Sequence, residues 1–227
     1  SGPSLGGQVN AGLLSPAFTQ SSALTPTAIV RAQYRGADDS FGVGGMVGVA
    51  NDTVRIGVIA AHEKGDDLRF PGGRIASTGF ERSIYGITIG AQSGPAAVEL
   101  EYRRQETDKS GNPPFSMDII YFDTDFLRMK FTGDLSDTVQ LQVKGGHVAV
   151  RHLMDNNSFR TAPADPTRWR ESFASSDSFN GGAALRFGRA DAYVMVGADF
   201  DMHTNYMAIS NPNNANFFIT AFNDTTT

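Results

Sequence analysis

Apolar and polar residues alternate with a period of two along most of the chain. Residues 98–102 read VELEY, and residues 139–143 read VQLQV. This alternation places successive side chains on opposite faces of a β-strand, whereas a helix repeats its apolar positions every three to four residues. Similar alternation predicts further strands near residues 28–35, 41–49, 54–58, 80–91, 127–132, 171–187 and 192–203. The pattern therefore predicts an all-β protein.

The links between the predicted strands fall into two kinds. Short, turn-like links lie at residues 51–52, 93–95, 133–137 and 188–191, and longer links rich in Pro, Gly and Asn lie at residues 64–79, 106–121 and 155–170. Because short and long links alternate, an up-and-down antiparallel sheet would carry its short turns at one end and its long loops at the other. That asymmetry is typical of outer-membrane β-barrels, and strands of about 9–12 residues have the length needed to cross a bilayer at a tilt.

These features predict an antiparallel, up-and-down transmembrane β-barrel. A sheet in lipid must close on itself so that every backbone group is paired. Within residues 98–102, Val98 and Leu100 would then face lipid, and Glu99 and Glu101 would face a wet lumen. A soluble β-sandwich would show the same alternation, with its apolar face packed on a second sheet. The regular alternation of turns and loops, together with the strand length, favours the barrel.

Composition narrows the functional classes. The absence of cysteine excludes disulfides and thiol chemistry, and the net charge of −5 gives no indication of a nucleic-acid partner. No apolar run approaches the ~18–20 residues of a membrane-spanning helix. Acidic pairs at positions 99 and 101, and at 123 and 125, have the spacing of the wet face of a strand. Neither a Gly-x-Ser-x-Gly nor a His-Glu-x-x-His motif occurs, so we expect that the chain is not an enzyme.

Three stretches resemble TonB-dependent outer-membrane receptors. Residues 2–10, GPSLGGQVN, resemble the last strand of the plug domain of these receptors, and residues 116–133 and 150–160 resemble segments of the subgroup of receptors for copper. The resemblance implies the N-terminal part of a barrel of about 22 strands. Residues 1–15 would end the plug domain and enter the barrel, and residues 16–227 would form a partial barrel of about nine to eleven strands.

The resemblance also implies a function. The chain would belong to an uptake receptor for a metal or metal chelate, with copper as one candidate, in the outer membrane of a Gram-negative-type bacterium. Its partners would be outer-membrane lipid, the small-molecule or metal ligand, and an energy-coupling TonB complex that acts through a plug lying almost wholly outside these residues. Two alternatives are a small self-contained barrel acting as a passive pore or structural protein, and a soluble β-sandwich binding module. An even, closed set of strands would favour the first alternative, and solubility without detergent would favour the second.

The candidate metal ligands are His203 and Met207, in the stretch DMHTNYM at residues 201–207. A thioether with an imidazole is a soft donor set that suits copper(I). Because four is an even number, the two side chains would share one face of a regular strand, and Met202 would point away. A simpler interpretation is that the methionines fill gaps or face lipid. Two further soft side chains lie at the outer end of another predicted strand: His152 and Met154.

Overall fold

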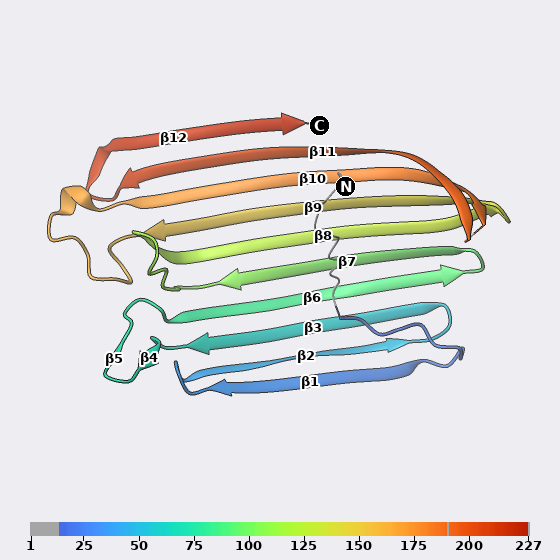
Figure 1. Ribbon diagram of the computed structural model, residues 1–227, viewed down its shortest axis with the longest axis horizontal. Helices are drawn as coiled ribbons and strands as arrows, with labels where there is room; N and C mark the ends of the chain where they lie inside the picture. The colour runs from blue at the N-terminus through green and yellow to red at the C-terminus, as the bar shows by residue number, and fades with distance from the viewer. Residues whose placement is uncertain (1–13, 190, 227) are drawn as a thin grey trace.

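The computed structural model describes residues 14–189 and 191–226. Ten strands form one antiparallel sheet in chain order, and a short hairpin forms a second sheet (Figure 1). The main sheet contains β1 (Thr25–Arg35), β2 (Ser40–Ala50), β3 (Val54–Gly65), β6 (Phe80–Ser93), β7 (Ala96–Thr107), β8 (Asp118–Ser136), β9 (Val139–Asp155), β10 (Glu171–Arg189), β11 (Ala192–Asn211) and β12 (Asn214–Thr226). The hairpin contains β4 (Arg69–Phe70) and β5 (Gly73–Arg74), and a 3₁₀ turn, η1, spans Pro166–Arg168.

One face of the main sheet, here called the apolar face, carries exposed aliphatic side chains. Val47 lies opposite Val58, which lies opposite Ile87 on the next strand, and opposed residues of antiparallel strands point to the same side. Val47 is 58% exposed, and Leu127 in the same band is 45% exposed. Within the described residues the second sheet is only the β4–β5 hairpin, so no second sheet covers this face. The expected packing of a sandwich is therefore missing from this part of the chain.

The other face, here called the polar face, carries the charged residues of the alternation. Glu99 and Glu101 lie on it as expected, with Glu99 paired to Arg55 and Glu101 to Arg128. Arg128 also lies 3.8 Å from Glu99, so the four charges form one chain of contacts across the sheet. Because Glu101 is buried, these pairs lie in a partly shielded environment where their attraction is stronger than in bulk water.

The segment before β1 crosses the polar face. Pro16 is fully buried there, and a Cβ atom added to Gly57 would lie 2.6 Å from Pro16 Cδ. Arg55 donates a hydrogen bond to the Pro16 carbonyl at 3.2 Å, and its guanidinium lies 4.9 Å from the ring centre of Phe18. Glycine at position 57 thus leaves the room that the proline occupies. The predicted boundary between residues 1–15 and 16–227 stays a prediction, because residues 1–13 lie outside the described part.

The two ends of the sheet differ much as the sequence predicts. At the turn end, on the right of Figure 1, the links are residues 51–53, 94–95, 137–138 and 190–191. At the loop end, residues 66–79, 108–117 and 156–170 form long connections. Residues 36–39 and 212–213 at this end are short, so the predicted strict alternation of short and long links does not hold throughout. Strands β8 to β11 have 17 to 20 residues, longer than expected, and extend the sheet toward the loops.

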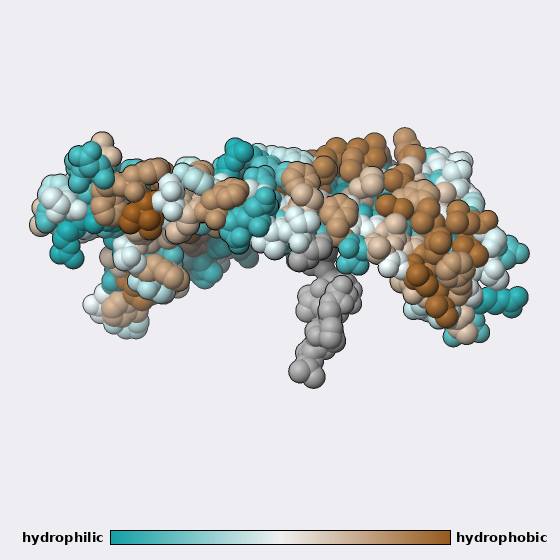
Figure 2. Space-filling model, turned by 90° about the horizontal axis from the view of Figure 1, so that it is seen from above, coloured by the Kyte–Doolittle hydropathy of each residue, from teal (hydrophilic) through white to brown (hydrophobic). Residues whose placement is uncertain are grey.

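Toward the loop end, the apolar face carries tyrosine and charged side chains in place of aliphatic ones. Tyr102 donates a hydrogen bond to Asp125 at 2.6 Å, and Arg104 pairs with Glu106, Asp123 and Asp125 at 2.7–3.2 Å. Figure 2 shows the same division, with apolar residues gathered mainly over the half of the molecule that contains the turn end. Among the described residues, no helix is long and apolar enough to span a membrane. An apolar band bounded by tyrosines and charges is the surface pattern of a barrel wall at a membrane interface.

Candidate cation site on the polar face

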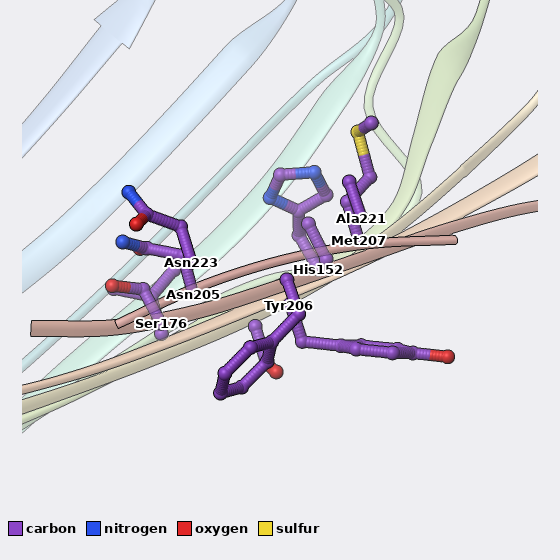
Figure 3. Close-up of a pocket in the computed structure, with 11 residues that line it drawn as sticks. His152, Ser176, Asn205, Tyr206, Met207, Ala221 and Asn223 are labelled. Carbon is purple, nitrogen blue, oxygen red and sulfur yellow. The ribbon is translucent and has the colours of Figure 1, made fainter. Parts of the chain in front are cut away.

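The register of β9, β10 and β11 brings two soft side chains together at the loop end of the polar face. Ala174 on β10 lies opposite His152 on β9 and opposite Met207 on β11. Neighbouring strands are about 4.8 Å apart, so the Cα atoms of His152 and Met207 are roughly 10 Å apart. Only the methyl group of Ala174 stands between them. In Figure 3 both side chains extend from the same side of the sheet, whereas the Tyr206 ring lies on the other side.

These two side chains line one open pocket of about 270 Å³. Ser176, Asn205 and Asn223 line its side nearer the turn end, adding hydroxyl and carboxamide groups. Phe122 on β8 stacks on the His152 ring, with the ring centres 5.3 Å apart and the planes 14° apart. The stack restricts the imidazole to one orientation, while the thioether of Met207 remains 40% exposed at the residue level. The arrangement therefore has one fixed nitrogen donor and one accessible sulfur donor.

Burial affects the protonation of His152. The residue lies beyond the apolar band, at the level where Arg151 and Asp123 occupy the opposite face. Burial lowers the pKa of His152 below the usual value for histidine, because desolvation disfavours the charged imidazolium. A neutral imidazole is the form that binds a metal ion.

His203 and Met207 share the polar face of β11 as predicted, but they have different neighbours. They are four residues apart, which is roughly 13 Å along a strand, and His203 is not among the residues lining the pocket. His203 Nδ1 lies 2.7 Å from Ser178 Oγ, and its Nε2 lies 3.0 Å from Asp201 Oδ1. Whether either residue binds a metal stays a prediction. The geometry places His203 and Met207 in two separate surroundings, not in one.

The sequence identifies His152 as a soft side chain but does not show that it lies near Met207. These residues are 55 positions apart, and their proximity depends on two successive strand registers that the sequence does not reveal. Met154, which was noted beside His152, lies opposite Ile119 and Ser172 on the same face of β9. Among the described residues, no group of three or more His, Asp or Glu side chains is arranged to hold a metal ion. A cation site in this region would consequently depend on methionine sulfur or amide oxygen as well.

The fold and its two contrasting faces are those of the wall of an antiparallel β-barrel. No model of a protein family matches the chain, and no curated protein matches it. Among solved structures the chain is similar to the copper transporter OprC, with a TM-score of 0.73 and 15% identity over 94% of this chain and 34% of that one. It is also similar to the ferric yersiniabactin uptake receptor FyuA from Yersinia pestis, with a TM-score of 0.60 and 12% identity over 94% of this chain and 39% of that one.

Both solved proteins are TonB-dependent receptors, and the likeness confirms the predicted partial barrel. At these identities the likeness shows the fold and not the activity. The chain spans between a third and two fifths of the length of the two receptors. In the described residues the sheet remains open between β1 and β12, as expected for part of a larger barrel.

Proposed function

We propose that the chain forms part of the barrel of an outer-membrane uptake receptor and that the His152–Met207 pocket captures copper. The observation that carries this proposal is the meeting of an imidazole and a thioether across Ala174 on the polar face. Thioether ligands select copper(I), and imidazole suits copper in general, so the two donors together favour copper over harder cations. The copper transporter OprC has the same fold, which supports the choice of ion.

A metal chelate is the second candidate, because FyuA is a receptor for ferric yersiniabactin. The size of the pocket argues against it. Pockets for drug-sized ligands measure about 300–1,000 Å³ and enclose most of the ligand. The present pocket of about 270 Å³ is open and lies below that range. A bare ion with two or three protein donors fits the available space better.

In this proposal the lumen lies on the polar face and outer-membrane lipid contacts the apolar face. Exposed valine and leucine side chains are stable in hydrocarbon, and a wall of paired strands satisfies its backbone groups there. Energy for uptake would come from a TonB complex acting through a plug domain. The segment that contains the buried Pro16 lies on the polar face, and the chain enters β1 later, at Thr25. We expect transport and no catalysis.

The test uses the full-length protein in detergent, with Ag⁺ as a redox-inert substitute for Cu⁺. We expect His152→Ala and Met207→Leu each to weaken Ag⁺ binding at least tenfold, as measured by competition with a chelator. Met207→Leu retains the side-chain volume and removes only the sulfur. His147→Ala is the matched control, because His147 stacks on Phe179 on the apolar face. Unchanged Ag⁺ affinity in both pocket variants would show that the pocket is not the copper site.

A further inference from the structure

The apolar face has a hollow over β2 and β3. Gly45 on β2 lies opposite Ala60 on β3, so two neighbouring positions of this face lack a large side chain. A Cβ atom added to Gly45 would lie 2.3 Å from the carbonyl oxygen of Ile29, so the pairing of β1 with β2 leaves no room for a side chain there. The floor of the hollow therefore consists of a glycine and an alanine.

Larger side chains surround this floor. Five of them form the walls: Val30, Val43, Val47, Val58 and Tyr85. Val43 and Val47 lie on either side of Gly45 along β2, and Tyr85 lies opposite Ala60 on β6. The five residues are 40–75% exposed. The hollow has a volume of about 540 Å³, within the range of about 300–1,000 Å³ found for sites that hold a small molecule. It is thus large enough to hold part of another molecule.

The position of the hollow on the lipid-facing side of a barrel wall indicates what fills it. Left empty, the hollow would deprive its lining of dispersion contacts, and a valine-lined surface offers water too few polar partners. From Val43 to Val47 the hollow extends roughly 13 Å along β2. One leaflet of a bilayer is about 15 Å deep, which is half of the hydrocarbon core. A single acyl chain therefore matches the hollow in both chemistry and length.

Polar groups follow the hollow toward the loop end, where a headgroup region would begin. His62 Nδ1 and Ser83 Oγ are 2.9 Å apart at the edge of the hollow. Two residues farther along β3, Lys64 Nζ lies 2.7 Å from the Glu81 carboxylate. This ion pair presents one positive and one negative charge, as the headgroup of a zwitterionic lipid does. A glycolipid with several phosphates would find no excess positive charge in this pair.

We infer that the hollow binds one acyl chain of a zwitterionic phospholipid whose headgroup contacts Lys64 and Glu81. The hydroxyl of Ser83 and the ring of His62 then lie beside the ester groups, between the chain and the headgroup. The wall would thus hold one lipid at a fixed place, in addition to the lipids that contact the rest of the apolar face. The inference rests on the part of the proposed function that places lipid on the apolar face, and it is independent of copper.

The test uses the full-length protein in detergent with added phosphatidylethanolamine, and native mass spectrometry measures the lipid that stays bound. We expect the native protein to retain one lipid. Ala60→Leu fills the floor of the hollow and should weaken retention at least about tenfold, the factor that corresponds to losing the burial of two methylene groups. Ala91→Leu is the matched control, because Ala91 lies on the same face, opposite Val54, and does not line the hollow. It should retain the lipid as the native protein does.

The headgroup contact has a variant of its own. Glu81→Gln leaves the charge of Lys64 unpaired, so this variant should retain the anionic phosphatidylglycerol in preference to phosphatidylethanolamine. Equal retention of phosphatidylethanolamine by the native protein and Ala60→Leu overturns the inference. Preferential retention of lipid A by the native protein, or a lipid-free mass of two chains, overturns it as well. Ala60→Leu should bind Ag⁺ as the native protein does, because the His152–Met207 pocket lies on the other face. Failure of the lipid site and failure of the copper site are therefore separate results.

Discussion

The long loops above the pocket are joined by one buried ion pair, and its removal gives a measurable prediction. Asp118, at the first position of β8, is fully buried. Arg160, in the loop after β9, donates to both oxygens of Asp118, at 2.7 and 2.6 Å. It also donates to the carbonyls of Phe115 at 2.9 Å and Asn112 at 3.3 Å. One guanidinium thus connects the loop of residues 156–170 to that of residues 108–117.

Replacing Arg160 with Ala leaves the Asp118 carboxylate buried without its partner. Removing one member of a buried pair typically costs about 3–5 kcal/mol. Arg160 is 23% exposed, so the lower part of that range is appropriate here. We therefore expect the free energy of local opening of the two loops to fall by about 3 kcal/mol, which corresponds to amide exchange roughly 100-fold faster. Hydrogen–deuterium exchange of peptides covering residues 108–118 and 156–165 measures this change.

The matched control is Arg168→Ala, which removes an exposed arginine from the same loop. Its exchange rates should stay within about threefold of the native protein, since single exposed charges contribute little. Peptides at the turn end, such as residues 49–56, should be unaffected in both variants. If Arg160→Ala changes loop exchange no more than Arg168→Ala does, the ion pair does not hold the loops together.

Three further predictions concern other parts of the sheet. Gly57→Ala should displace Pro16 and destabilise the segment before β1 by about 1–3 kcal/mol, the usual cost of overpacking, measured by exchange of residues 14–24. Ala174→Leu should fill the gap over β10 and abolish Ag⁺ binding at the pocket, measured by chelator competition. At the loop-end turn, Arg35 lowers the pKa of Asp38 well below the usual range for aspartate. The amides of the native turn should therefore stay protected from hydrogen exchange above the ordinary pKa of aspartate, and lose this protection only as the pH falls through the lowered pKa of Asp38. Asp38→Asn should remove this pH dependence. Hydrogen–deuterium exchange across a pH series measures both.

Each of these predictions has a variant that isolates its cause. Gly145→Ala is the control for the glycine, because a Cβ atom there would come no closer than 3.9 Å to another residue's atoms. Ala149→Leu, on the other face of β9, is the control for filling the gap over Ala174. If Gly57→Ala leaves the amide exchange of residues 14–24 unchanged, Pro16 does not pack on Gly57 as described. If Ala174→Leu retains Ag⁺ binding, the space over Ala174 is not the binding site.

Much of the fold could be predicted because it depends on local properties of the chain. Alternation within a strand determines which side chains share a face, and Val98 and Glu99 lie on opposite faces as expected. The short links at the turn end were also predictable, since residues such as Gly94 adopt backbone conformations that favour tight turns. The long strands were underestimated, because β8 to β11 continue past the apolar band into polar sequence. There, pairing with neighbouring strands maintains the strand without an apolar signal.

The candidate site was predictable only in its residue types. Histidine and methionine were recognised as soft donors, but which of them meet depends on register between strands. His152 and Met207 lie on either side of β10, opposite Ala174. The spacing of His203 and Met207 along β11 does not reveal this proximity.

The irregularity at the loop end of β8 connects the Asp118–Arg160 ion pair to the pocket. The register between β8 and β9 shifts between Ile119 and Tyr121, so β8 contains one more residue than its partner at this point. Below the shift, Phe122 lies opposite His152 and stacks on it. Above the shift, Asp118 lies opposite Asp155, within reach of Arg160. Without the extra residue the pairing beyond Tyr121 would move by one position, and every side chain there would change face. The bulge therefore allows one strand to supply both the ring that orients His152 and the carboxylate that joins the loops above it.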